Sequence, residues 1–309
     1  MNDNKFQNTY TIAILAFICC FLWGSAIPII KKGYSILQID AEDMASQLVF
    51  AGARFTLAGI MIILFGSILF RGQMKPNPRL WKLSVILSIF QTIGQYAFFY
   101  IGAAHTSGVK GTIIVGLNNF CAILVACLVF RQEKLTQQKL LGCMIGLCGI
   151  LIINILGNQV DLGFHMAGEG CYLLSTISYS FSTVLISRFS KQEYAVALSG
   201  YQFTIGGIVL FLAGRGFGGV IPSITYQSLI LLLYLAFVSA VAYTLWSILL
   251  AHNPVSRVAV FGFMNPLCGV ILSALILKEM DRLQGFFPIL ALLLVCIGIF
   301  VVNKSEEAS

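Results

Sequence analysis

Amide side chains stand inside long apolar stretches of this chain of 309 residues. Gln91 and Gln95 are four residues apart, which puts both on one face of a helix. Asn118, Asn119 and Asn265 lie in two other apolar stretches. An amide offers hydrogen-bond donors and acceptors, so it can hold an ammonium or hydroxyl group of a ligand. Because a polar group in an apolar setting needs a partner, these residue types point to reversible ligand binding.

Aromatic and hydroxyl side chains add a second set of candidates. Trp23 and Trp246 are the tryptophans well inside apolar stretches, Tyr243 precedes Trp246 by three residues, and Ser178 adjoins Tyr179. Such rings can line a cavity for an apolar or aromatic ligand, but they also fill cores. Serines and amides also form hydrogen-bonded contacts between helices. We predict ligand binding at Trp23, Gln91, Gln95, Asn118, Asn119, Ser178, Tyr179, Tyr243, Trp246 and Asn265.

Arg54, His105 and His252 each allow a functional and a structural interpretation. Arg54 lies about 10 Å into an apolar stretch by the helical rise, and a guanidinium there could hold a ligand carboxylate through two hydrogen bonds. We favour snorkelling to the membrane interface, or capping of another helix. The histidines fall at the ends of apolar stretches, and there we favour a structural role over pH sensing.

No catalytic or metal-binding motif accompanies these residues. The sequence lacks a His-Glu-x-x-His pattern, and Cys143 and Cys148 do not have a metal-binding spacing. All nine cysteines lie in apolar stretches, where we expect them to pack. We therefore expect no enzyme activity, cofactor or metal. No Asp or Glu lies in the middle of a stretch, and Glu169 is at an edge. This favours facilitated exchange of a neutral or zwitterionic ligand, or coupling through a less obvious group, over a carboxylate proton relay.

The composition places these residues in a lipid bilayer. Apolar residues make up 58% of the chain and charged residues 10%, with a mean hydropathy of +0.91, whereas soluble domains carry about a quarter charged residues. Water-soluble enzymes and nucleic-acid-binding proteins are excluded by this balance. A membrane span needs about 20 apolar residues. The predicted fold class is an all-α integral membrane protein with ten transmembrane helices, at residues 10–30, 47–70, 81–103, 108–130, 138–156, 167–188, 195–214, 226–250, 256–277 and 284–303.

Basic residues predict the orientation of these spans. With a cytoplasmic N-terminus, the cytoplasmic side holds Lys5, Arg71, Lys75, Arg79, Lys82, Arg131, Lys134, Lys139, Arg188, Lys191, Arg257 and Lys304. The opposite side holds half as many, namely Lys31, Lys32, Lys110, Arg215, Lys278 and Arg282. Because cytoplasmic loops carry the excess of Lys and Arg, both termini are predicted to be cytoplasmic.

An internal repeat predicts the architecture. A shift of 147 residues aligns Asn118 with Asn265, and a shift of 148 aligns Phe55-Thr56 with Phe203-Thr204. Residues 1–156 and 157–309 are therefore predicted to be two homologous modules of five spans each. Because five is odd, the second module enters the bilayer from the opposite side, which gives an inverted repeat around a central cavity. Such repeats are typical of secondary transporters.

The chain resembles the drug/metabolite transporter superfamily, in particular the EamA-type carriers with ten spans. The resemblance rests on Trp23-Gly24-Ser25, Arg54-Phe55, Asn265-Pro266, Glu133 and Glu279 after the fourth and ninth spans, and the closely spaced Gly142, Gly146 and Gly149. The chain departs from the family at Asn119, where a proline is usual, so the two modules need not kink alike. The resemblance implies efflux of amino acids or other small metabolites from a helical basket with a central cavity.

A secondary transporter in a cell membrane, expected to be the bacterial inner membrane, is the leading hypothesis. Its partners would be a small-molecule substrate and lipid, without nucleic acid, and it would act as a monomer or homodimer. Two other classes stay open. A channel or lipid scramblase shares the composition but has less need of two inverted modules, and an intramembrane enzyme would need a catalytic pair that the sequence lacks.

Overall fold

The computed structural model describes residues 6–40, 42–70, 72–106, 108–155, 163–221, 223–276 and 287–307, and every regular element in these ranges is a helix. Of the helices in these ranges, eight are long and apolar enough to cross a membrane. They are α1 (Thr9–Leu37), α2 (Met44–Leu69), Pro78–His105, Lys110–Val129, α9 (Ala195–Gly216), α10 (Tyr226–His252), Val255–Ile276 and Phe287–Lys304. The chain is therefore a multi-pass membrane protein, as its composition predicts.

Length and composition identify eight spans among the described helices, whereas the sequence predicts ten. The helix α7 (Gln137–Ile155) contributes a shorter apolar segment, Gln137–Ile152. The helix α8 (Cys171–Phe189), which follows the π-helical turn η4 (Met166–Gly170), is long enough but rich in serine and threonine. Both helices begin and end within a few residues of the predicted spans.

Hydroxyl groups explain why α8 is so polar. Ser175 and Ser178 donate hydrogen bonds to the carbonyl oxygens of Gln95 and Phe90, at 2.8 and 2.7 Å. Most residues of α8 are buried, so other helices rather than lipid cover it. A helix whose polar groups are satisfied by its neighbours does not need a fully apolar surface.

Three of the long helices change their winding midway. Pro266 lacks the N–H that would bond the Gly262 carbonyl, and the helix is wound at that glycine as a 3₁₀ turn. The fourth predicted span breaks at Leu117, directly before Asn118, although it has no proline. Both predicted modules are therefore interrupted in corresponding spans, the fourth at Leu117 and the ninth at the turn that holds Gly262. The segments are α3 (Pro78–Ser88), η2 (Ile89–Gly94) and α4 (Gln95–His105); α5 (Gly108–Gly116), α6 (Asn118–Leu124) and η3 (Val125–Val129); and α11 (Val255–Ala259), η5 (Val260–Phe263) and α12 (Met264–Ile276).

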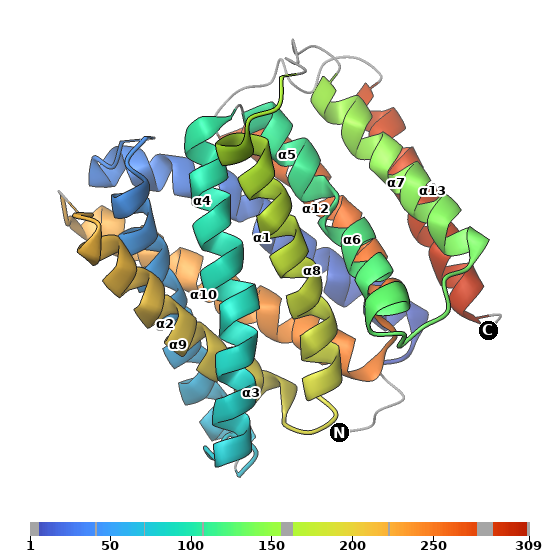
Figure 1. Ribbon diagram of the computed structural model, residues 1–309, viewed down its shortest axis with the longest axis horizontal. Helices are drawn as coiled ribbons and strands as arrows, with labels where there is room; N and C mark the ends of the chain where they lie inside the picture. Colours follow the sequence, from blue (N-terminus) through green and yellow to red (C-terminus); the bar gives the residue numbers. More distant parts are fainter. Residues whose placement is uncertain are drawn as a thin grey trace.

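Glycines bring α2 and α9 into backbone contact along one edge of the bundle (Figure 1). A Cβ at Gly52 would collide with the main chain of Phe211, and a Cβ at Gly59 with that of Thr204. Residue numbers rise along α2 as they fall along α9, so the two helices are antiparallel. Small residues are what allow helices in a bilayer to approach so closely.

At the other edge, α7 packs against α13 (Phe287–Glu307), again through glycines (Figure 1). A Cβ at Gly142 would lie 2.7 Å from the carbonyl oxygen of Gly298, and a Cβ at Gly149 would lie 2.8 Å from that of Ala291. This pair is also antiparallel. The close packing predicted from the glycines of the fifth span is confirmed, and it is a contact within the chain.

Six helices lie between these two edges. The helix α1 packs against α10 and α12, and α8 packs against α4 and α6 (Figure 1). In the predicted repeat, α1 corresponds to α8, α10 to α4, and α12 to α6. Under the predicted repeat, the contacts of α1 with α10 and α12 therefore correspond to those of α8 with α4 and α6.

Two sequence predictions concern where segments of the chain begin and end. The helix α1 continues to Leu37 rather than ending near residue 30, because Lys31 and Lys32 lie on its exposed side in the last turns. The predicted module boundary at residues 156 and 157, and Glu279 of the family motif, lie outside the described residues.

Candidate functional site

Aromatic residues from five helices meet in the interior of the bundle. We call them the central aromatic cluster: Trp23, Phe55, Tyr96, Phe203, Tyr243 and Trp246. They come from α1, α2, α4, α9 and α10. Phe55 and Phe203 are fully buried, and Tyr243 and Trp246 nearly so. The cluster lies where the sequence predicts a ligand site.

Two contacts in the cluster join corresponding residues of the predicted modules. Phe55 stacks on Phe203 with ring centroids 5.2 Å apart and planes 4° from parallel. A hydrogen bond of 2.8 Å joins the hydroxyl groups of Tyr96 and Tyr243. Phe55 also contacts Tyr96, and Phe203 contacts Tyr243, with centroid distances of 4.4 and 4.8 Å. Residues 147 or 148 positions apart therefore meet each other at the centre.

The two tryptophans extend the cluster. The Trp23 ring meets the rings of Tyr243 and Trp246 at centroid distances of 5.0 and 5.1 Å. The indole nitrogens of both tryptophans are buried and have no hydrogen-bond partner among the described residues. An apolar ring with an unsatisfied donor suits a ligand that has both an apolar part and a hydrogen-bond acceptor. Tyr179 of α8 is buried next to this group and interacts electrostatically with Tyr96.

Four of the predicted amides also keep unsatisfied atoms. The side-chain oxygens of Gln91, Gln95, Asn118 and Asn265 are buried and lack a hydrogen-bond partner in the part of the chain that the structure describes. A buried acceptor without a donor costs about 1–3 kcal/mol. These oxygens are therefore suited to a ligand that brings its own N–H or O–H groups, and their role in binding stays a prediction.

Asn119 and Ser178 are engaged in helix packing. The Asn119 amide lies so close to Gly262 that a Cβ on that glycine would collide with it. Ser178 donates to the carbonyl oxygen of Phe90, within the π-helical turn η2. Both residues hold irregular turns of neighbouring helices in place, and a contact of either with a ligand stays a prediction.

Arg54 is buried, so the favoured interpretation of snorkelling is wrong. Its side chain is only 5% exposed, and the guanidinium carbon lies 4.3 Å from the ring centroid of Phe55 and 5.8 Å from that of Tyr96. Both rings attract the cation and hold it away from the interface. Its Nε atom is buried without a hydrogen-bond partner among the residues described. By contrast, His105 and His252 each place Nδ1 2.8 Å from the carbonyl oxygen four residues earlier, a local helical contact.

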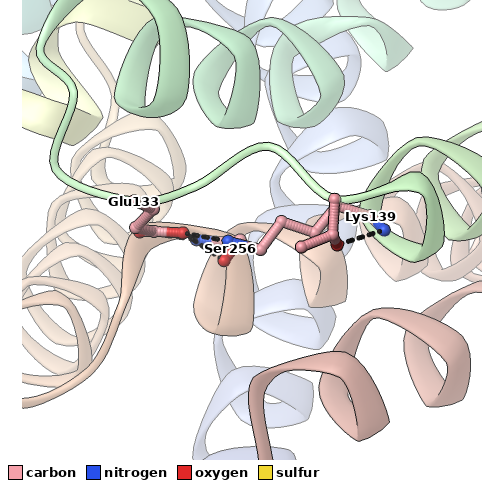
Figure 2. Close-up of polar contacts among 4 residues, drawn as sticks. Glu133, Lys139 and Ser256 are labelled. Atoms are coloured by element: carbon pink, nitrogen blue, oxygen red, sulfur yellow. Dashed lines mark hydrogen bonds and ion pairs between the residues drawn. The ribbon is translucent and has the colours of Figure 1, made fainter. Parts of the chain in front are cut away.

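A charged cluster joins two helix ends (Figure 2). The carboxylate of Glu133, in the segment between η3 and α7, accepts a hydrogen bond from Lys139 Nζ at 3.0 Å. It also accepts from the backbone N–H of Ser256 at 3.3 Å and from the hydroxyl of that serine. Because Ser256 lies in the first turn of the helix Val255–Ile276, the cluster connects the end of the fourth predicted span to the start of the ninth.

A second carboxylate cluster lies at the opposite end of the helix Lys110–Val129. Glu169 accepts hydrogen bonds from the Thr106 hydroxyl at 2.5 Å and from the His165 backbone N–H at 2.8 Å, and it pairs with Lys110 at 3.0 Å. These contacts, that of Thr106 first, lower the pKa of Glu169 to about 2. The carboxylate is therefore ionised at neutral pH and fixed by its neighbours.

Sequence reasoning did not include Phe55, Tyr96 and Phe203 in the predicted site, and it favoured a structural role for Arg54. The repeat carried a signal for the three rings, because residues close to a two-fold axis meet their own counterparts. The same shift that aligns Asn118 with Asn265 aligns Tyr96 with Tyr243. For Arg54 the sequence carried no such signal, since its counterpart is Gln202.

Two hollows of about 380 Å³ lie outside the cluster. Met74, Lys75 and Tyr201 line the first, and Thr56 and Phe211 contribute to the second, on the outer side of α2 and α9. Neither is lined by a predicted site residue. At the centre, where the sequence predicts a ligand cavity, the rings contact one another, so a ligand would need the rings to move apart.

Comparisons with known proteins find transporters among the similar chains. The sequence profile of the EamA-like transporter family matches residues 10–155 and 166–304. A transporter of Bacillus subtilis named YvbV is 24% identical over 98% of this chain and 95% of its own length. A "probable amino-acid metabolite efflux pump" of Escherichia coli is 25% identical over 93% of both chains. An S-adenosylmethionine/S-adenosylhomocysteine transporter of Chlamydia muridarum is 29% identical over 66% of this chain and 64% of its own.

A solved crystal structure shares the fold. It aligns with a TM-score of 0.75 and 15% sequence identity, covering 97% of this chain and 98% of the other. At this identity the likeness concerns the arrangement of helices alone. The relatives are named as transporters rather than enzymes, in agreement with the sequence-based expectation.

Proposed function

The chain belongs to the EamA-like transporter family, and from this premise we propose that it is a secondary transporter that moves small metabolites by alternating access. The contact of Phe55 with Phe203 and of Tyr96 with Tyr243 carries the proposal. Corresponding residues meet in this way around a two-fold axis. Rocking of the two modules about this centre would open a path to one side of the membrane while closing the other.

Two inverted modules, residues 1–156 and 157–309, are the basis of the proposed mechanism. Their support is the antiparallel packing of corresponding helices, α2 with α9 and α7 with α13. The two ranges that match the family profile fall within the two modules. The short α7 and the polar but enclosed α8 would complete ten spans, five in each module.

Amino acids and related neutral or zwitterionic metabolites are the proposed substrates, with export as the direction. The Escherichia coli relative is named for amino-acid metabolites, and the chlamydial relative for an amino-acid derivative. The unsatisfied amide oxygens of Gln91, Gln95, Asn118 and Asn265 suit an ammonium group, and the central aromatic cluster suits an apolar side chain. Tyr179, Asn119 and Ser178 would complete the wall of this site.

The proposed setting is a bacterial inner membrane with both termini in the cytoplasm, and the chain would act as a monomer or homodimer. The excess of Lys and Arg in the predicted cytoplasmic loops supports this orientation. Because no acidic residue lies in the middle of a predicted span, we propose facilitated exchange without a carboxylate proton relay.

Counterflow in proteoliposomes tests the proposal. Vesicles that hold the purified chain and a high internal concentration of one amino acid are given the labelled compound outside, and a panel of amino acids is scanned. A carrier accumulates label transiently and saturably, whereas a channel or scramblase lets it equilibrate. Failure of the whole panel, together with unsaturable leakage, contradicts a carrier.

A matched pair of tryptophan variants localises the site. Trp246 is 2% exposed in the cluster, and Trp81 is 47% exposed near the start of α3. The variant Trp246→Phe is expected to lower exchange roughly ten-fold or more, because the ring is cut back at the ligand. The variant Trp81→Phe is expected to exchange like the parent. Equal effects of both variants would place the site elsewhere.

A further inference from the structure

A buried cation that has no acidic partner among the described residues stands beside the central aromatic cluster. Arg54 lies in α2, which is long and apolar enough to span the membrane, and its side chain is 5% exposed. The guanidinium group of arginine is always charged in proteins. The guanidinium therefore carries a full positive charge into the interior.

The ion pairs that the described residues form are elsewhere. They join Lys110 to Glu169 and Lys139 to Glu133, at the ends of helices. None of them includes Arg54, whose contacts are the rings of Phe55 and Tyr96. Its buried Nε has no hydrogen-bond partner among these residues. A buried charge is normally paired, so the charge of Arg54 calls for an anion that the described part of the chain does not supply.

The fold itself does not need this charge. Gln202 of α9 occupies the corresponding position in the second module, and it is fully buried and neutral. Its Oε1 accepts a hydrogen bond from the Thr92 hydroxyl at 2.8 Å. A neutral amide is therefore compatible with the packing of this position. The positive charge is a feature of one wall of the cluster only.

The surroundings of Arg54 suit a carboxylate. Aromatic rings lie against the guanidinium, which leaves its N–H edge for two parallel hydrogen bonds to one planar anion. The Tyr96 hydroxyl, on one of these rings, adds a hydrogen-bonding group on this side of the cluster and bonds the hydroxyl of Tyr243 at 2.8 Å.

We propose that Arg54 binds the carboxylate of the transported solute, so that the substrates are carboxylate-bearing metabolites, with the apolar part of the solute against Trp23 and Trp246. This inference rests on the proposed function and narrows it, because it excludes amines, amides and nucleosides without a carboxylate. It also orients the solute, with its acidic end toward α2.

Matched acids and amides test the proposal. In proteoliposomes loaded for counterflow, L-leucine, L-methionine and L-phenylalanine are compared with L-leucinamide, L-methioninamide and L-phenylalaninamide. Because a charge-assisted, two-pronged hydrogen bond is lost with the amide, each acid is expected to compete roughly 10- to 100-fold better. The variant Arg54→Gln, which copies the residue of the other module, is expected to lose this preference, and Arg54→Lys to keep part of it.

The control removes an equal charge elsewhere. Arg215 lies in the last turn of α9, where it donates to the carbonyl oxygen of Gly219. The variant Arg215→Gln is expected to keep the preference for acids. A monodisperse profile and an unchanged melting temperature confirm that each variant folds. An unchanged preference for acids in Arg54→Gln, or equal exchange of acids and amides by the parent, overturns the proposal.

A binding measurement separates this inference from the proposed function. In a Trp81→Phe background, fluorescence reports on Trp23 and Trp246, both of which contact Tyr243 or each other. Titration with benzoate and with benzamide compares a carboxylate with its neutral isostere. A preference for benzoate that disappears in Arg54→Gln supports the carboxylate site, even if no amino acid is exchanged. The absence of exchange would then contradict only the transport proposal. Equal responses to benzoate in both proteins overturn the site.

Discussion

The charged residues at the ends of the bundle and the charged residue at its centre are held in different ways. At the ends, Glu133 is bonded to Lys139 and Ser256 (Figure 2), and Glu169 is bonded to Lys110 and Thr106. At the centre, Arg54 is held against aromatic rings. The end clusters are complete within the described residues, whereas the central charge lacks an acidic partner there.

This difference separates charges that stabilise the fold from a charge that is available to a solute. The end clusters connect segments far apart in sequence, such as residue 133 with residue 256. Removing one of their members leaves another charge or N–H without its partner. Removing the charge of Arg54 leaves no described carboxylate without a partner, because none of them pairs with it. Neutralising a residue of an end cluster should therefore lower the free energy of unfolding, whereas neutralising Arg54 should leave it unchanged or raise it.

The largest effect is expected for Glu133→Ala. The side chains of Glu133 and Lys139 are 9% and 4% exposed, so the pair is buried. Breaking a buried pair by removing one partner costs about 3–5 kcal/mol, and the backbone N–H of Ser256 also loses its acceptor. We expect a marked fall in the free energy of unfolding, measured by thermal or denaturant unfolding in detergent. The exposed Glu42, changed to Ala, is the control and should have little effect; equal stability of the two variants would contradict a stabilising role for the cluster.

Neutralising Arg54 is expected to have the opposite effect on the free energy of unfolding. Arg54→Gln removes a buried charge that has no acidic partner among the described residues, and the same amide is accommodated at Gln202. We expect the free energy of unfolding to stay the same or rise by about 1–2 kcal/mol, while exchange of carboxylates falls. Unfolding in the absence of substrate measures this, and a destabilisation as large as that of Glu133→Ala would assign Arg54 to the structural class.

The contrast also shows which features the sequence could predict. The helices begin and end close to the predicted spans, because the thickness of the bilayer fixes the length of an apolar helix. Trp23, Tyr243 and Trp246 were predicted as a group and contact one another, since aromatic residues with polar tips are informative inside a span. The close packing at Gly142 followed from the spacing of small residues in the same way.

The state of Arg54 could not be predicted, because it depends on the neighbouring helices α4 and α9. From its depth alone, the side chain could reach the interface. Burial follows from the rings of Phe55 and Tyr96 and from the packing of α2 against α9. The hydrogen bond of Ser178 could not be predicted for the same reason. Its hydroxyl donates to the carbonyl oxygen of Phe90, in the π-helical turn η2 of another helix.

A pH titration sharpens the comparison at the other end cluster. The pKa of Glu169 is lowered to about 2 by the Thr106 hydroxyl, the His165 N–H and Lys110, whereas an unperturbed glutamate titrates near about 4.3. Its contribution to stability is therefore fully present above about pH 5 and is lost as the pH falls toward 2. The melting temperature of the parent should fall over this range more than that of Glu169→Gln. Parallel curves for the two proteins would show that the carboxylate adds nothing as an anion.

The smallest effect is expected where neutral groups join the two modules. The hydrogen bond between the Tyr96 and Tyr243 hydroxyls, at 2.8 Å, connects corresponding residues and involves no charge. Tyr96→Phe and Tyr243→Phe keep the rings, so each should cost about 0.5–1.5 kcal/mol, and the double variant should cost less than the sum of the two. A double-mutant cycle of unfolding free energies measures this coupling. Additive effects would mean that the hydroxyls do not stabilise one another, and the contact would then be one that opens readily when the modules move.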